Sequence, residues 1–358
     1  MKQTIRFCRS RDGVGIAYAT TGQGPPLVKT ANYLTHLEHD ARSPVWRHWL
    51  RELSAQNTLV RYDARGSGLS DWEVDTYSIP AWVQDLEAVV DALGLESFPL
   101  LGVSQGAAVA IAYAAKHPDQ VSRLVLYGGY ARGRFHRDTS EAPRREAEAM
   151  ITLMRVGWGK DNPALRQLFS ASLMPDADQE QMDSLNELAR VSATPDNASR
   201  MERAFYDIDV IDEAKAVSVP TLVMHARRDS GIPFEEGRLL ASIIPKARFV
   251  ALEGRNHILT ESEPGWSRFV TELRSFLGAD AEPAETSEPS PLVRDLSPRE
   301  RQTLALIAEG LDNAQIASRL GISPKTVRNT ASRVYRKLGV SNRVQAIVRA
   351  RKSDDDSR

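Results

Sequence analysis

A serine lies between two glycines at the point where an apolar run gives way to a helix. After Phe98-Pro99-Leu100-Leu101 comes Gly102-Val103-Ser104-Gln105-Gly106, and an alanine-rich helical segment follows. A serine at a sharp strand-to-helix turn is exposed above its sheet, and such a turn leaves no room for side chains at the two glycine positions. The helix N-terminus supplies positive potential and a free main-chain N–H where an oxyanion would form. The segment therefore predicts a nucleophilic serine, Ser104.

A serine hydroxyl needs a general base, and the base needs an acid that orients it. In doubly wound sheets these partners lie on loops beyond the carboxyl ends of strands. Asp229 and His257 each follow a predicted strand. The predicted strand that precedes these two in the chain is followed by Gly128 and Gly129, which offer no carboxylate as an alternative orienting acid. We therefore predict Ser104, Asp229 and His257 as the catalytic group, in the chain order Ser, Asp, His.

Short apolar runs alternate with helical patterns over most of the chain. The predicted strands are Pro26–Lys29, Asn57–Tyr62, Phe98–Leu101, Arg123–Tyr127, Pro220–His225 and Arg248–Leu252. The predicted helices include Trp46–Ala55, Ile79–Leu93, Ala107–Lys116, Pro233–Ile243 and Glu263–Phe276. Such alternation predicts an α/β fold with a mostly parallel, doubly wound sheet covered on both faces.

The alternation stops between residues 133 and 215, where the spacing is helical and no strand is indicated. The region carries large apolar side chains at Met150, Ile151, Met154, Trp158, Leu165, Phe169, Leu173 and Met174. We interpret it as a helical insertion over the sheet. These side chains would form the insertion's own core or line a pocket beneath it, and in the second case the ligand would be largely apolar.

The charge of the chain is unevenly distributed. Residues 291–358 contain 14 Lys/Arg and 7 Asp/Glu, a net charge of +7, whereas the whole chain has a net charge of −1. Between the two parts, residues 279–291 are acidic and rich in proline, with no aromatic or β-branched aliphatic residue, and are predicted to be an extended linker. The basic end suggests nucleic-acid binding, although a solvated basic helix pair would have the same charge.

The basic region carries four helix-start signals, at Ser297-Pro298, Asn313, Ser323-Pro324 and Ser341. Each helix has an apolar stripe, and Gly321-Ile322 makes a tight turn between the second and third, which is the spacing of a helix-turn-helix. Residues of the third helix would contact phosphates and base edges in a DNA groove. They are Lys325, Thr326, Arg328, Asn329, Arg333, Arg336 and Lys337.

Both halves of the chain resemble known families. The serine turn, the order of the three catalytic residues and the loop Asp63-Ala64-Arg65-Gly66-Ser67-Gly68 resemble the α/β-hydrolase fold. The motifs Leu296-Ser-Pro-Arg-Glu300, Ser323-Pro-Lys-Thr-Val327 and Arg336-Lys-Leu-Gly-Val340 resemble the four-helix domain of LuxR-type transcription regulators. The resemblance implies that residues 133–215 are a cap over the pocket. It also implies a homodimer paired through the fourth helix, at Val344, Ile347 and Val348.

This organisation gives expected boundaries for the parts of the chain. We expect a hydrolase-like sensor or catalytic domain over 1–278, the linker over 279–291, the DNA-binding domain over 292–352 and an acidic tail over 353–358.

The chain departs from these families in three places. Hydrolases of this fold usually carry His-Gly or Pro-Gly after the third strand, where a second oxyanion N–H is presented, whereas this chain has Ala31-Asn32-Tyr33. By position, the donors would be the amides of Tyr33 and Gln105, and turnover could be slow, because losing one donor typically reduces the rate by about 10²–10³-fold. In the basic region, Thr330 replaces a frequent histidine and Ala314 a frequent lysine, which would alter base preference or phosphate contact.

Several classes of protein are not expected. The chain has no run of 18 apolar residues and no apolar block after Met1, which argues against a membrane span or a secretory signal. A single cysteine, Cys8, cannot form an internal disulfide, so we expect a cytoplasmic protein. No histidine has a second ligand at metal spacing, so no metal or other cofactor is expected.

Three functions remain open. The first is a transcription regulator that binds double-stranded DNA and senses a small, largely apolar ester or lactone, with or without slow hydrolysis. The second is an active serine hydrolase, an esterase or lactonase, whose association with DNA is secondary. The third is a pseudoenzyme whose pocket binds a protein or is structural.

Overall fold

The computed structural model describes residues 2–137, 139–160 and 163–278, and, nearer the C-terminus, residues 298–308, 311, 313–320, 323, 326, 327, 330, 331 and 334. The chain divides into two compact units, Met1–Gly278 and Ala279–Arg358. Each unit is described by itself.

The described part of the first unit is built on one eight-stranded sheet, with strand order β1-β2-β4-β3-β5-β6-β7-β8. The strands are β1 (Gln3–Arg9), β2 (Gly15–Thr21), β3 (Pro26–Lys29), β4 (Thr58–Tyr62), β5 (Phe98–Val103), β6 (Val121–Tyr127), β7 (Thr221–Ala226) and β8 (Ala247–Leu252). The β1–β2 and β2–β4 pairs are antiparallel and all the others are parallel. This architecture confirms the predicted α/β fold with a mostly parallel sheet.

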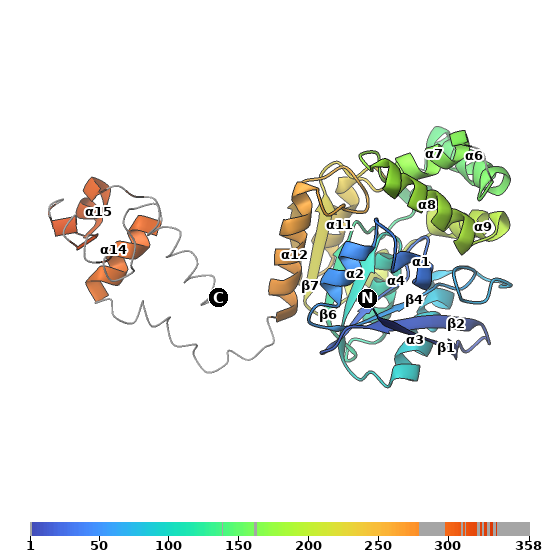
Figure 1. The fold of residues 1–358 in the computed structure, drawn as a ribbon, viewed down its shortest axis with the longest axis horizontal. Helices are drawn as coiled ribbons and strands as arrows, with labels where there is room; N and C mark the ends of the chain where they lie inside the picture. Colours follow the sequence, from blue (N-terminus) through green and yellow to red (C-terminus); the bar gives the residue numbers. More distant parts are fainter. Residues whose placement is uncertain are drawn as a thin grey trace. The chain divides into compact units, whose positions relative to one another are not determined.

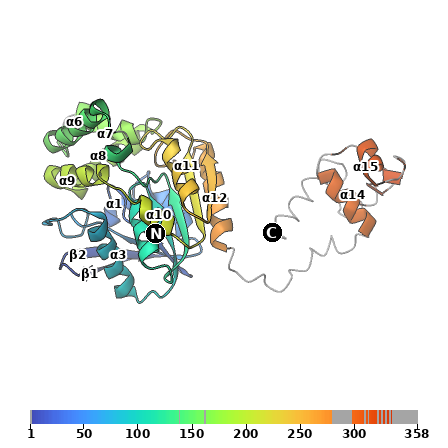
Figure 2. The same cartoon turned by 180° about the vertical axis from the view of Figure 1, so that it is seen from behind.

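Helices cover both faces of the sheet (Figures 1 and 2). One face is covered by α3 (Ile79–Leu93), α4 (Gly106–Lys116), α10 (Ile211–Ala216) and α11 (Phe234–Ile243), and the other by α2 (Arg47–Leu53) and α12 (Pro264–Leu277). A short helix, α1 (Leu37–Asp40), follows β3. On the second face Trp49 packs against Trp266 and Phe269, with ring centroids 5.2 and 4.5 Å apart. These aromatic contacts are part of the hydrophobic core between the sheet and the two helices.

The predicted insertion is a helical cap above the carboxyl ends of the strands (Figure 1). It contains α5 (Arg134–Arg137), α6 (Glu141–Gly157), α7 (Pro163–Leu173), α8 (Gln179–Ser192) and α9 (Pro195–Tyr206). The boundary differs from the prediction at its end. Helix α10 packs against α4, so the segment after residue 209 belongs to the layer that covers the sheet and not to the cap.

The sequence pattern does not predict two of the strands, β1 and β2. Strand β1 lies at the edge of the sheet and pairs only with β2 among the described strands, and its side chains are exposed or half-buried. An edge strand of this kind has no continuous apolar run, so little in the local sequence marks it. The other six strands and the five predicted helices form at the predicted positions, with ends shifted by at most two residues.

The described part of the second unit contains α14 (Pro298–Ala308) and α15 (Asn313–Leu320). Their buried side chains, Ile307 and Ile316, pack in one cluster with Val327 and Ala331 from the segment that follows. The Ser323 hydroxyl accepts a hydrogen bond of 3.1 Å from the Thr326 main-chain N–H, and Val327 N donates to Ser323 O at 3.1 Å. The predicted helix start at Ser323 is therefore present. In neither unit is any described helix long and apolar enough to cross a bilayer.

Candidate active site

Ser104 occupies a strained turn at the end of β5. Its φ angle is 57°, and it is the one residue other than glycine with positive φ in the described chain. A Cβ atom at Gly102 would lie 2.6 Å from the Ala107 Cα, and one at Gly106 would lie 2.5 Å from the Thr30 Oγ1. The two glycines therefore allow the helix to start directly against the strands, as the sequence predicted. Backbone strain of this kind persists only where the surrounding structure enforces it, and it is concentrated at functional sites.

Asp229 and His257 meet across the loops that follow β7 and β8. The His257 Nδ1 lies 2.9 Å from Asp229 Oδ2 and 3.0 Å from Oδ1, and both side chains are buried. Asp229 Oδ1 also accepts 2.9 Å hydrogen bonds from the main-chain N–H groups of Gly231 and Ile232. Burial alone would raise the pKa of Asp229, but the adjoining His257, together with His225 and the Ile232 N–H, more than offsets this effect and holds the pKa below its ordinary value.

The opposite nitrogen of His257 is available for chemistry. Nε2 is buried and has no hydrogen-bond partner in the described chain. Two glycines enclose the ring, because a Cβ atom at Gly128 or at Gly231 would lie 3.1 Å from it. With Nδ1 donating to the Asp229 carboxylate, Nε2 carries the lone pair that can accept a proton.

A second histidine lies against the same carboxylate. The His225 Nε2 is 3.5 Å from Asp229 Oδ2 and 3.0 Å from the Ile232 carbonyl oxygen. Burial lowers the pKa of His225, so the ring is neutral at neutral pH and donates a proton from Nε2 toward these oxygens. The sequence indicated only that His225 ends a strand. Among the described residues no group of His, Cys, Asp or Glu side chains could hold a metal ion.

Ser104 and His257 line one cavity of about 500 Å³ beneath the cap. Their side chains are not hydrogen bonded to each other in the structure. Its apolar wall comes mainly from the cap, through Met150, Met154, Trp158, Phe169, Leu173 and Leu185. Met154 and Trp158 are also buried in the main core, so the cap's apolar residues serve both roles that the sequence left open. Met174 packs in the core behind the sheet and does not line the cavity.

The cavity also has a polar group of side chains that the sequence did not single out. They are Tyr130, Arg134, Arg137, Glu202 and Tyr206, from the start of the cap and from α9. Charged residues on an otherwise amphipathic helix are usually solvated, so only the cavity itself distinguishes these from surface residues.

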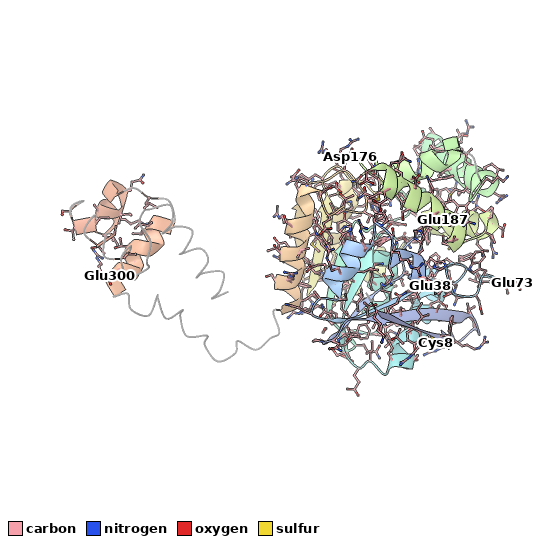
Figure 3. The ribbon with its side chains drawn as sticks, in the orientation of Figure 1. Cys8, Glu38, Glu73, Asp176, Glu187 and Glu300 are labelled. Atoms are coloured by element: carbon pink, nitrogen blue, oxygen red, sulfur yellow. The ribbon has the colours of Figure 1, made fainter. Side chains whose placement is uncertain are left out.

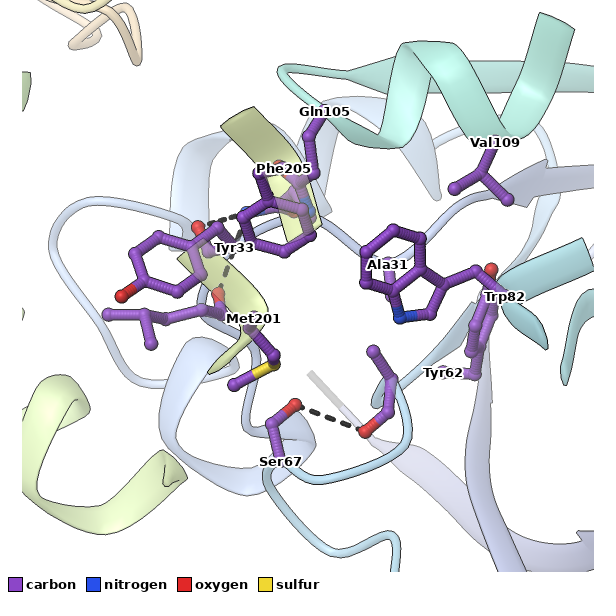
Figure 4. Close-up of a pocket in the computed structure, with 12 residues that line it drawn as sticks. Ala31, Tyr33, Tyr62, Ser67, Trp82, Gln105, Val109, Met201 and Phe205 are labelled. Atoms are coloured by element: carbon purple, nitrogen blue, oxygen red, sulfur yellow. Dashed lines mark hydrogen bonds between the residues drawn. The ribbon is translucent and has the colours of Figure 1, made fainter. Parts of the chain in front are cut away.

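Tyr33 and Gln105, the predicted oxyanion donors, both line the base of the cavity. No acceptor is present for either main-chain N–H in the described part of the chain. Figure 4 shows the small space of about 20 Å³ beside them, bounded by Trp82, Met201 and Phe205. The Tyr33 ring meets Phe205 edge-on, with centroids 5.3 Å apart, so this loop also supports the cap.

The loop that carries Tyr33 is held by a buried lysine. Lys29, the last residue of β3, donates from Nζ to Asn32 Oδ1 and, at 3.2 Å, to the Thr30 carbonyl. Asn32 Nδ2 in turn donates to the Tyr33 carbonyl at 3.1 Å. Burial lowers the pKa of Lys29, while the neighbouring Asp40 opposes that effect. The one sequence signal for this role is that a lysine ends an otherwise apolar strand.

The cap is tied to the loop of His257. The His257 main-chain N–H donates to the Leu173 carbonyl of α7 at 2.7 Å, and the Asp176 N–H donates to Asn256 Oδ1 at 2.9 Å. The Asp176 carboxylate, labelled in Figure 3, also pairs with Arg255 at 2.8 Å. A displacement of α7 would therefore act directly on the histidine loop.

The predicted DNA-contacting side chains are only partly described. Thr326 is exposed, near the start of its helix. The others, Lys325, Arg328, Asn329, Arg333, Arg336 and Lys337, and the predicted dimer contacts Val344, Ile347 and Val348, lie outside the described residues.

Comparison with known proteins agrees with both architectures. Residues 40–264 match the family model for the alpha/beta hydrolase fold. The chain belongs to the α/β-hydrolase fold family. In addition, residues 294–350 of this hydrolase-fold protein match the model of bacterial regulatory proteins of the luxR family, so it also carries a LuxR-type DNA-binding domain.

Three relatives illustrate the similarity of the hydrolase domain. Pyrrolizixenacetamide deacetylase of Xenorhabdus hominickii is 28% identical over 267 residues, which cover 73% of this chain and 94% of that protein. An esterase from Rhodococcus sp. ECU1013 superposes with a TM-score of 0.61 and 25% identity, covering 77% of this chain and 98% of that one. The esterase of Exiguobacterium antarcticum superposes with a TM-score of 0.65 at 24% identity, covering 76% and 98%.

Proposed function

We propose that this protein is a transcription regulator whose hydrolase-fold domain binds a small, largely apolar ester, lactone or amide and hydrolyses it slowly. The observation that carries the proposal is the capped cavity of about 500 Å³, lined by Ser104 and His257, in a chain that also has a LuxR-type domain. A cavity of this size matches a small-molecule ligand, and its apolar wall favours an apolar one.

The geometry supports hydrolysis through an acyl-serine. His257 Nε2 takes the proton of Ser104 Oγ as the oxygen attacks the ligand's carbonyl carbon, and the C–O or C–N bond to the leaving group breaks as the same nitrogen returns the proton. Asp229 holds the required tautomer of the ring. Water then attacks the acyl-serine by the same route. The main-chain N–H groups of Tyr33 and Gln105, which have no acceptor among the described residues, are the proposed donors to the carbonyl oxygen.

The similarity to a deacetylase and to an esterase supports this chemistry, because both names describe removal of an acyl group by water. A retained Ser, Asp and His arrangement also favours turnover over a purely structural pocket.

In this proposal, ligand binding in the cavity changes the DNA affinity of the LuxR-type domain. An occupant touches both the cap and the His257 loop, which are joined at Leu173. It shifts an equilibrium between two arrangements only to the extent that it binds them with different affinity. We propose that the chain acts on double-stranded DNA as a homodimer, with half-sites one helical turn apart, and that it works in the cytoplasm.

The test is whether occupancy of the cavity changes DNA binding. Phenylmethylsulfonyl fluoride, which sulfonylates an activated serine with loss of fluoride, serves as the occupant, and mass spectrometry locates the adduct. The affinity of the full chain for a duplex from its own upstream region is then measured by fluorescence anisotropy. We expect a change in Kd of roughly 5-fold or more, the lower range of allosteric coupling. The Ser104→Ala protein, treated in the same way, is the control.

Equal affinity and stoichiometry with and without the adduct would leave the second candidate, a serine hydrolase whose DNA association is secondary. Absence of both the adduct and ester hydrolysis would favour the third, a pseudoenzyme.

A further inference from the structure

The polar side chains of the cavity form one cluster at the start of the cap. The Arg137 guanidinium lies over the Tyr130 ring at 4.5 Å, and the Arg134 guanidinium lies over the Tyr206 ring at 5.7 Å. The Glu202 carboxyl shares a hydrogen bond with the Tyr206 hydroxyl. These groups interrupt a wall that is otherwise largely apolar, with several methionine, leucine and aromatic side chains.

Most members of the cluster have partners within the protein. Arg134 pairs with Glu146 at 3.2 Å, and Glu202 is hydrogen bonded to Tyr206. Burial raises the pKa of Glu202, while the Tyr206 hydroxyl and the Arg134 guanidinium oppose that effect.

Arg137 is the exception. Its Nε donates to the Arg132 carbonyl oxygen at 2.7 Å, but among the described residues Nη1 and Nη2 have no acceptor and no carboxylate lies within ion-pair distance. The nearby Glu236 is already bound to Arg132 at 2.8 Å. Burial lowers the pKa of Arg137 and the neighbouring Arg132 and Arg134 cations act in the same direction, while Tyr130 and Glu236 oppose them.

The guanidinium is also fixed in place. A hydrogen bond through Nε and the contact with the Tyr130 ring hold it in the wall of the cavity that Arg137 lines. A guanidinium whose terminal nitrogens have no acceptor among the described residues suits bidentate binding of a planar anion, because two parallel N–H donors match the two oxygens of a carboxylate.

We propose that Arg137 is the binding site for a carboxylate carried by the ligand, so that the ligand class is an apolar ester, lactone or amide with one free carboxylate. A single guanidinium balances a single negative charge, which favours a carboxylate over a dianionic phosphate monoester. The inference rests on the proposed function in that it assumes that the cavity receives a small molecule.

The first experiment compares esters that differ only in charge. The p-nitrophenyl monoesters of glutaric and suberic acid carry a carboxylate, and p-nitrophenyl pentanoate and octanoate are their neutral counterparts. In the wild type we expect the acidic esters to be preferred. In Arg137→Gln we expect kcat/KM for the preferred acidic ester to fall by about 10- to 100-fold, the range of a charged hydrogen bond, with the neutral esters changed less than about 3-fold.

Arg190→Gln is the matched control. It also removes one cap cation, but Arg190 is exposed and pairs with Glu187 on the surface of α8. The ratio of acidic to neutral ester should stay unchanged in this variant. Hydrolysis of the neutral ester by Arg137→Gln shows that the variant is folded.

The second experiment measures binding without chemistry. Calorimetry compares octanoate with octanamide, first on Ser104→Ala protein and then on protein that also carries Arg137→Gln. Tighter binding of octanoate than of octanamide, with the difference abolished by Arg137→Gln, supports the carboxylate site. This result would support the site even if the wild type hydrolyses no ester, and only the proposed catalysis would then fail. Hydrolysis of neutral esters with no charge preference, and equal binding of the two octanoyl compounds, would overturn the carboxylate site and leave the hydrolase proposal intact.

Discussion

The His257 Nδ1 lies 2.9 Å from Asp229 Oδ2, while Nε2 of the same ring is buried beside the cavity with no partner in the described chain. One side of the imidazole is therefore fixed, and the other remains free to accept a proton. Ser104 lines the same cavity from a turn with a φ of 57°. This arrangement and the DNA-binding domain together lead to five predictions.

Replacing the proposed nucleophile should abolish hydrolysis. Ser104→Ala removes the oxygen that attacks the carbonyl carbon, and we expect kcat for a short p-nitrophenyl ester to fall by at least about 10³-fold. Burst kinetics at high protein concentration measure the acyl-serine directly. An unchanged burst would remove Ser104 from the mechanism.

Replacing the carboxylate should affect catalysis more than the fold. In Asp229→Asn the amide can donate to Nδ1, which favours the tautomer with its proton on Nε2, and we expect kcat to fall by about 10³- to 10⁴-fold. Asp229→Glu keeps the charge and should retain more activity than Asp229→Asn. Similar activities in the wild type and Asp229→Asn would contradict the assigned role.

The same carboxylate should make stability depend on pH in acid. The pKa of Asp229 is lowered in the folded state, so the unfolded chain binds the proton first as the pH falls. Its contribution is complete above the unfolded pKa of about 3.9 and is lost as the pH falls through the folded value. Urea unfolding of the wild type and Asp229→Asn should give a stability difference that is constant above about pH 5 and shrinks below about pH 4. A difference that grows on acidification would reverse the sign of the assigned shift.

Lys29 is expected to act on turnover through the loop of Tyr33. Lys29→Met removes the donor to Asn32 Oδ1, which loosens a loop proposed to present an oxyanion N–H. We expect kcat to fall by about 10- to 100-fold with KM changed less than about 3-fold, because a misplaced donor weakens only the transition state. Lys116→Met is the control, since Lys116 is half-exposed and its partner, the buried Glu87 carboxylate, also binds His117. An equal effect on kcat and KM in Lys29→Met would indicate a general loss of structure.

DNA binding should depend on the basic residues of the third helix in the second unit. Arg328→Ala combined with Lys337→Ala should weaken binding and reduce the slope of log K against log salt by about 2, one for each phosphate that no longer has a cationic partner. Arg190→Ala removes an exposed cation from the hydrolase unit and should leave the slope unchanged. An unaltered slope in the double variant would argue against placement of that helix in the groove.

The single cysteine is not expected to contribute to any of these activities. Cys8, labelled in Figure 3, is half-buried on β1, and burial raises the pKa of its thiol to about 11. A thiol with this pKa stays protonated and unreactive at neutral pH.

The features that depend on short-range patterns could be predicted from the order of residues. Neighbouring residues indicate the turn at Ser104, the alternation of strands and helices, and the helix start at Ser323, because turn geometry and helix capping are local. The positions of Asp229 and His257 followed from one further rule, that ligands of an α/β sheet gather at the carboxyl ends of its strands. Their contact at 2.9 Å is visible only in the folded chain.

Which side chains face the cavity, and which support it, depends on how distant segments pack together. Arginine is usually a surface residue, and only the folded cap shows that Arg137 lines the cavity and that its guanidinium has no carboxylate partner among the described residues. Lys29 and Asn32 are three residues apart, but their bond matters because the surrounding core excludes water from both. Burial and the pairing of charges depend on residues that are distant in the chain, and no local pattern encodes them.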